Sequence, residues 1–198
     1  DYYGVRLFHP FGERDLCGRA TLATGAAVFG RSDWLASTED LLRQAVWWMG
    51  PEALKRSVAA YAPPAGVVHH ANTGLVVCTT ASTQLVMDTG PLGAGTAGHS
   101  HSDTLAVLLR VGEEELLIDA ATFTYVGDVN WRNWFRGTAA HNTIRIDGLD
   151  QASPPGPFRW LDPPEVQLIT CRDNPDVFVE AVCRDCWTQP LRYSCGPA

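Results

Sequence analysis

The stretch Ala62-Pro63-Pro64-Ala65-Gly66 separates two parts of the sequence that have different hydrophobic patterns. Consecutive prolines followed by a glycine favour a loop over any regular element. The residues before this stretch are rich in helix formers, whereas short apolar runs typical of strands follow it. The sequence therefore predicts an α+β chain, with a helical domain over residues 1–62 and a strand domain over residues 63–198.

The helical part is expected to contain short, alanine-rich helices joined by brief loops, over residues 20–29, 41–49 and 52–61. Gly30 and Gly50 are expected to end the first two helices. Such an arrangement is typical of the end of an antiparallel helical array. The aromatic residues of this part are expected in the core, with a sugar-binding cleft as the alternative for Tyr2, Tyr3, Trp47 and Trp48.

The second part is expected to contain strands over residues 74–80, 83–88, 104–111, 115–119, 141–146, 165–170 and 177–182. Residues 151–164 hold five prolines and one glycine, which predicts a loop. Many short strands without helices between them favour an antiparallel β-sandwich.

Composition excludes some classes of protein. The formal net charge of -7 disfavours nucleic acid as a partner, and no apolar run is long enough to predict a membrane span. The opening residues resemble the interior of a longer protein rather than a signal peptide. Cys183 and Cys186 form a single CxxC pair, for which a chance pairing or a strand position is favoured over a redox or zinc role.

Three segments of the strand part carry side chains that bind metals. The stretch Gly98-His99-Ser100-His101 places two histidines two residues apart, and Asp119 and His141 each adjoin an apolar run. Two histidines and one carboxylate form a familiar zinc set if neighbouring strands bring His101, Asp119 and His141 together. The alternative is that Asp119 caps a turn, His141 is a hydrogen-bonded core residue and the histidine pair lines a loop.

Four motifs in order resemble the heparinase II/III family of polysaccharide lyases, whose pattern runs close to GHGHAD, LLVDPGTYTY, WRNYFRSTAAHNT and DGQDQ. The matching residues are 98–103, 117–125, 131–143 and 147–151. Residues 10–15 resemble a family segment near the end of the helical domain. Trp134 departs from the family tyrosine, and Ala120-Ala121 replaces the common Pro-Gly.

This resemblance implies the C-terminal helices of an (α/α) toroid followed by an antiparallel β-sandwich. It implies β-elimination on a uronic-acid polysaccharide, with His99 facing the substrate. His101, Asp119 and His141 match the family's metal ligands, usually zinc, with another divalent cation as the alternative. Arg132 and Arg136 are candidates for sulfate or carboxylate contact, with surface ion pairs as the alternative.

The resemblance also implies a periplasmic or secreted protein that acts on an acidic polysaccharide, with a homodimer as one option. The family's catalytic tyrosine and histidine of the toroid would precede residue 1, so this chain alone is expected to be inactive. Two alternatives stay open: a carbohydrate-binding protein without lyase activity, and a hydrolase that uses the His and Asp set to activate water.

Overall fold

The computed structural model describes residues 14–56, 65–112, 114–174, 176–184 and 191–195. Two compact units divide the chain, residues 1–63 and residues 64–198. None of the described helices is long and apolar enough to cross a membrane.

The first unit is built on α1 (Arg14–Phe29), with α2 (Glu39–Arg43), α3 (Ala45–Met49) and short 3-10 turns at Ser32–Trp34 and Pro51–Lys55. The core of this unit consists of small and aliphatic side chains: Ala23, Ala26, Ala27, Leu35, Leu41, Ala45 and Ala53. Gly30 and Gly50 have positive φ angles of 69° and 72°, as expected of residues that end helices. Trp47 and Trp48 are 85% and 74% exposed, so the prediction that they lie in the core is wrong for this unit; Tyr2 and Tyr3 lie outside the described residues.

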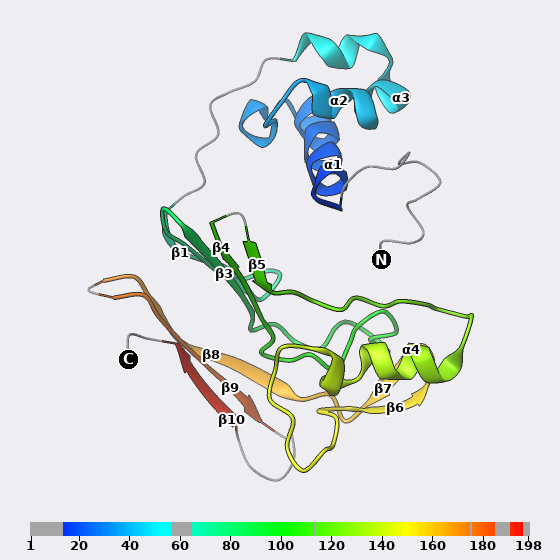
Figure 1. Cartoon of the computed structure of the whole chain (residues 1–198), viewed down its shortest axis with the longest axis vertical. Helices are drawn as coiled ribbons and strands as arrows, with labels where there is room; N and C mark the ends of the chain where they lie inside the picture. The colour runs from blue at the N-terminus through cyan, green and yellow to red at the C-terminus, as the bar shows by residue number, and fades with distance from the viewer. Residues whose placement is uncertain (1–13, 57–64, 113, 175, 185–190, 196–198) are drawn as a thin grey trace. The chain divides into compact units, whose positions relative to one another are not determined.

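The second unit contains a five-stranded antiparallel sheet in which each strand pairs with the next along the chain (Figure 1). Its strands are β1 (Gly66–His70), β2 (Leu75–Thr79), β3 (Thr83–Asp88), β4 (Val107–Val111) and β5 (Glu114–Leu117). Short turns at Gly74 and Gly112, both with positive φ, join β1 to β2 and β4 to β5, whereas the longer segment 89–106 connects β3 to β4. The segment that carries His101 therefore leads into β4, and Asp119 follows the end of β5.

A second antiparallel sheet consists of β8 (Glu165–Arg172), β9 (Phe178–Arg184) and β10 (Leu191–Cys195), in the order β10-β9-β8. The two sheets share one apolar core, in which Val76 and Met87 of the first sheet pack with Val179 and Ala181 of the second. The prediction of an α+β chain with an antiparallel second part is confirmed.

The structure corrects the predicted elements between residues 129 and 161. Residues 141–146 form bends rather than a strand. Residues 153–161, expected as a loop, contain the small hairpin β6 (Ser153–Gly156) and β7 (Arg159–Leu161), and α4 (Val129–Arg136) was not expected. The side chain of Asp128 begins α4 by accepting hydrogen bonds from the amides of Asn130 and Trp131.

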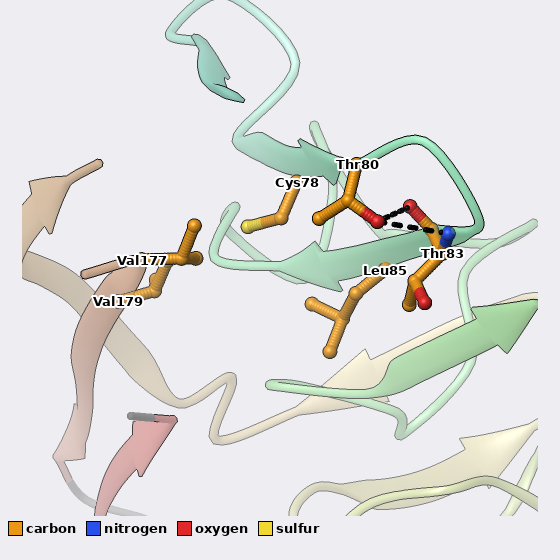
Figure 2. A pocket seen from close by; sticks show the side chains of 6 residues that line it. All are labelled: Cys78, Thr80, Thr83, Leu85, Val177 and Val179. Atoms are coloured by element: carbon orange, nitrogen blue, oxygen red, sulfur yellow. Dashed lines mark hydrogen bonds between the residues drawn. The ribbon is translucent and has the colours of Figure 1, made fainter. Parts of the chain in front are cut away.

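A small apolar pocket lies at one end of the shared core (Figure 2). It is lined by Cys78, Thr80, Thr83, Leu85, Val177 and Val179. A hydrogen bond joins the two threonines, because the amide of Thr83 donates to Thr80 Oγ1 at 3.0 Å. None of the lining side chains is charged, and Cys78 is the single residue of a metal-binding type among them, so this pocket offers no set of ligands.

Candidate metal and substrate site

The candidate ligands come from three loops of the second unit. His101 lies in the irregular segment before β4, Asp119 follows β5 by two residues, and His141 directly follows the 3-10 turn Thr138–Ala140. The paired strands β4 and β5 bring the first two loops together. The turn after α4 then returns the chain to the same place, because the amide of Val107 donates to the carbonyl of Asn142 at 3.0 Å.

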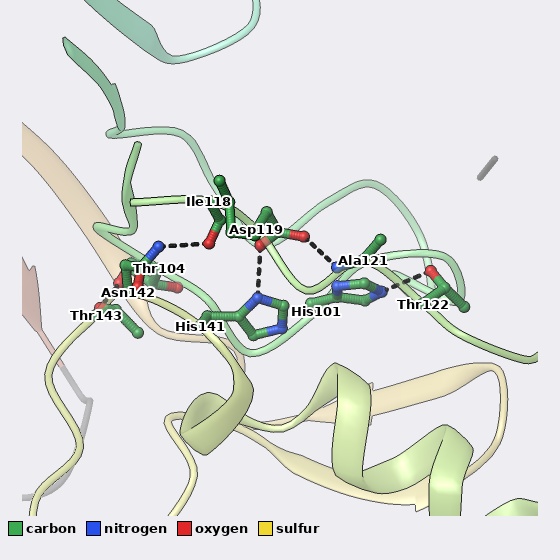
Figure 3. Close-up of polar contacts among 9 residues, drawn as sticks. All are labelled: His101, Thr104, Ile118, Asp119, Ala121, Thr122, His141, Asn142 and Thr143. Carbon is green, nitrogen blue, oxygen red and sulfur yellow. Dashed lines mark hydrogen bonds and ion pairs between the residues drawn. The ribbon is translucent and has the colours of Figure 1, made fainter. Parts of the chain in front are cut away.

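His101, Asp119 and His141 lie close enough to share one ion (Figure 3). One potential ligand atom from each side chain lies within 4.8 Å of the others. The two imidazole rings are 5.0 Å apart between centroids. Asp119 Oδ2 accepts a hydrogen bond from His141 Nδ1 at 2.7 Å, and His101 Nε2 lies 3.0 Å from Thr122 Oγ1.

The electrostatics favour the deprotonated forms of His101 and Asp119, whereas the pKa of His141, which burial lowers, is raised overall by its hydrogen bond to Asp119. Burial and the neighbouring His141 together lower the pKa of His101 to about 4, so His101 is neutral at pH 7. Burial opposes the ionised form of Asp119, but the hydrogen bond from His141, the charge of His141 and the amide of Ala121 together lower the pKa of this carboxyl. A neutral imidazole and a carboxylate are the forms that bind a metal.

One nitrogen of the cluster, His141 Nε2, is also available to a metal ion. The side chain of His141 is 0% exposed, and its Nε2 has no hydrogen-bond partner among the described residues. A buried imidazole nitrogen without a partner is costly unless it meets a cation or a donor. His101, Asp119 and His141 could therefore hold a metal ion.

The loop after Asp119 has an unusual backbone. Asp119 Oδ1 accepts a hydrogen bond from the amide of Ala121 at 2.7 Å, and Ala121 has a φ angle of 58°. This left-handed conformation favours glycine, which the family motif carries at the same position. The Ala-for-Gly departure is therefore strained, whereas Ala120 has no positive φ.

Ala121→Gly is expected to stabilise the protein by about 0.5–1 kcal/mol, because relief of the left-handed strain exceeds the extra entropy that glycine gives the unfolded chain. Ala120→Gly is the matched control and is expected to destabilise by about 0.5–1 kcal/mol. Denaturant unfolding of the two variants measures both free energies. Equal effects of the same sign would contradict the role assigned to the Ala121 backbone.

His99 separates from the metal cluster and joins an aromatic group. It is exposed, its Nδ1 lies 3.4 Å from the hydroxyl oxygen of Tyr125, and its ring lies 5.5 Å from the Tyr125 ring. Tyr125 stacks on Phe158 at 6.0 Å between centroids. Sequence reasoning did not select Tyr125, although the last tyrosine of the family's LLVDPGTYTY motif marks it.

Arg132 and Arg136 are 0% exposed, so the alternative of surface ion pairs is wrong. Arg136 donates to Asn133 Oδ1 and to the carbonyls of Gly156 and Pro157, which ties α4 to the β6–β7 hairpin. Arg132 donates to the carbonyls of Gly98 and Pro157, while its Nε and Nη1 have no hydrogen-bond partner among the described residues. Its guanidinium lies 4.4 Å from the centre of the Tyr125 ring, as in a cation–π pair.

Two further residues near this site, Trp134 and Asp103, have different surroundings. Trp134 is 54% exposed and packs edge-on against Phe135 at 5.0 Å. It carries no phenol, so no hydroxyl is available at this position. The backbone carbonyl of Asp103 accepts a hydrogen bond from the amide of Ala106, which closes a turn. Burial raises the pKa of the Asp103 carboxyl.

Comparison with known proteins relates most of the second unit to one family and nearly the whole chain to one fold. The family described as "Heparinase II/III-like, C-terminal" matches residues 62–191. Heparan sulfate lyase HepC from Pedobacter heparinus is 18% identical with a TM-score of 0.61, over 92% of this chain and 25% of that one. A structure titled heparinase III is 17% identical with a TM-score of 0.64, over 93% of this chain and 27% of that one. This chain thus spans about a quarter of those structures. No curated protein sequence matches it.

Proposed function

Because this chain belongs to the heparinase II/III-like C-terminal family, we propose that it forms part of a polysaccharide lyase that acts on uronic-acid polysaccharides by β-elimination. In this reaction a base removes the proton α to the uronate carboxylate. A carbon–carbon double bond then forms as the bond to the 4-oxygen breaks, and an acid protonates the leaving oxygen. The chemistry requires proton-transfer groups beside a local positive charge. The single observation that carries the proposal is that the motifs of this family lie together in space as His99, Tyr125 and the His101, Asp119 and His141 cluster.

His99 is the proposed group that faces the substrate. Its ring is exposed and its Nδ1 lies 3.4 Å from the Tyr125 hydroxyl, so a proton can pass between an imidazole and a phenol. We assign His99 to the neutralisation of the uronate carboxylate or to proton transfer. Tyr125 then orients the imidazole through this contact.

His101, Asp119 and His141 are the proposed ligands of a divalent ion, with zinc as the first choice. A bound ion would supply a fixed positive charge that holds the three loops and raises the local potential for an anionic substrate. Thr122 orients the imidazole of His101, because its hydroxyl forms a hydrogen bond with His101 Nε2.

Arg132 is the better of the two arginine candidates for the substrate carboxylate or sulfate. Arg136 donates hydrogen bonds to Asn133, Gly156 and Pro157, whereas two nitrogens of Arg132 have no partner within the part of the chain that the structure describes. Because Arg132 is buried beneath the Tyr125 ring, we propose that its positive charge attracts the substrate anion through the electric field and not through direct contact. Arg136 keeps the hairpin in place.

We propose that residues 1–62 are the end of a helical toroid and that residues 63–198 are a separate β-sandwich domain, as the sequence predicts. The whole protein is proposed to be periplasmic or secreted and to act on an acidic polysaccharide, while a homodimer stays an open prediction. This chain alone is expected to be inactive, because the resemblance assigns a further tyrosine and histidine to preceding residues.

The decisive experiment incubates the protein, expressed from its whole open reading frame, with heparan sulfate, with alginate and with neutral dextran as the control. Elimination gives new reducing ends together with the ultraviolet absorbance of an unsaturated uronate, and we expect both with an acidic substrate only. Reducing ends without this absorbance would favour hydrolysis. Binding without either product would favour a carbohydrate-binding protein, and each of these two results would overturn the proposal.

A further inference from the structure

A buried group of polar side chains lies between the two histidine segments, and we call it the polar clasp. It consists of Ser102, Thr104, Thr138, Thr143 and Gln151. Four of these residues are at most 4% exposed, and Thr143 is partly buried. None of them is a candidate metal ligand, so their burial calls for another reason.

One half of the clasp joins Ser102 to Thr138. Thr138 Oγ1 donates to Ser102 Oγ at 2.9 Å and accepts from the amide of Gln151 at the same distance. Ser102 Oγ also accepts from the amide of Ala152 at 3.1 Å, and the amide of Ser102 donates to the carbonyl of Arg136 at 2.8 Å. Three chain segments therefore meet at two hydroxyl groups.

The other half of the clasp is the side chain of Gln151. Its Nε2 donates to the carbonyl of Thr104 at 3.1 Å and to Thr143 Oγ1 and the carbonyl of Ile144, both at 3.2 Å. Thr143 Oγ1 also donates to the carbonyl of Thr104 at 2.5 Å. Gln151 thus holds the segment that follows His101 against the segment that follows His141.

We propose that the polar clasp sets the spacing of His101 and His141 and thereby raises the affinity of the site for its metal ion. Ser102 directly follows His101, and the turn that begins at Thr138 ends with the amide of His141 donating to the Thr138 carbonyl at 3.2 Å. The bond between Ser102 and Thr138 therefore connects the two ligand loops. This inference rests on the proposed metal site.

The third ligand loop is tied by a separate contact, which Figure 3 also shows. Asn142 Nδ2 donates to the carbonyl of Ile118 at 2.6 Å, so the residue after one ligand bonds the residue before another. The His141-Asn142-Thr143 stretch thus combines a ligand with one tie to each of the other loops. Ligands that are held near their bound positions lose less freedom when an ion binds, which strengthens binding.

The test measures zinc affinity of the whole protein by competition with a chromophoric chelator. Thr138→Val removes the hydroxyl but keeps the shape, and we expect a Kd about tenfold higher, in the range typical for residues that support metal ligands. Thr138→Ser restores the hydroxyl and is expected to restore the affinity. Thr89→Val is the matched control, because Thr89 is also buried and its Oγ1 donates to the carbonyl of Gly74 at 2.6 Å.

Thermal unfolding of the zinc-free proteins separates positioning from general stability. We expect Thr138→Val and Thr89→Val to lower the melting temperature alike, while only the former weakens zinc binding. Unchanged zinc affinity in Thr138→Val, or equal weakening in Thr89→Val, would overturn the inference and leave the metal site standing. A wild-type protein that binds no zinc would overturn both. If Thr138→Val does not fold, Ser102→Ala tests the same bond with a smaller change.

Discussion

Replacement of His99 by alanine is expected to lower kcat for elimination by about 10²–10⁴-fold, the usual contribution of a general acid or base. The imidazole of His99 is exposed and lies 3.4 Å from the Tyr125 hydroxyl, so its loss removes one proton-transfer group and leaves the other without its partner. We expect a smaller rise in KM, because the positive field of Arg132 stays in place. Steady-state kinetics on the whole protein, with the acidic substrate identified by the assay above, measures both constants.

His69→Ala is the matched control, because His69 is an exposed histidine on β1 outside the candidate site. Its kinetic constants are expected to match those of the wild type. A His99→Ala enzyme that keeps full kcat would remove His99 from the mechanism. A His99→Ala enzyme whose KM alone rises would restrict this residue to binding.

The class of the fold could be predicted because its determinants are local. Two consecutive prolines mark the change of period, and the strand Thr83–Asp88 was predicted with the bounds that the structure has. β1 was missed because Gly66–His70 is only half-buried or exposed and shows little alternation. The hairpin β6–β7 was missed because prolines within Ser153–Gly156 indicate a loop unless a neighbour fixes the backbone.

Helix α4 was missed for a different reason. Its arginines face the interior, with Arg132 and Arg136 at 0% exposure, while Trp131 and Trp134 are 52% and 54% exposed. Trp131, Trp134 and Phe135 do have helical spacing, but the buried face is the one that carries the arginines, the reverse of an ordinary amphipathic helix. The buried faces of the guanidinium groups stack on aromatic rings and meet backbone carbonyls, and neither type of partner is visible in a local window of sequence.

The ligand set could be named from family motifs, since His101, Asp119 and His141 each occupy a motif position. The contacts that arrange these residues could not. Tyr125 meets His99 across 26 positions of sequence, and Thr138 meets Ser102 across 36. Such pairs depend on how irregular loops close, and neither side-chain period nor spacing carries that information.

His141→Ala is expected to raise the Kd for zinc at least about 100-fold, above the range for residues that only support ligands. The change removes a ligand whose Nε2 is buried without a partner, and it frees Asp119 from the 2.7 Å hydrogen bond that orients the pair. Chelator competition gives the affinity, and metal analysis gives the number of ions per chain. X-ray absorption of the wild type is expected to show zinc–nitrogen distances of about 2.0–2.1 Å.

His99→Ala serves as the control for this experiment, because both variants remove an imidazole from the same region. His99→Ala is expected to keep zinc and lose elimination, whereas His141→Ala is expected to lose zinc. The two histidines are thus assigned separate tasks. Their contacts differ accordingly, because His141 lies 2.7 Å from Asp119 whereas His99 contacts Tyr125. Wild-type zinc affinity in His141→Ala, or loss of zinc in His99→Ala, would contradict that division, because a shared task would make the two variants fail together.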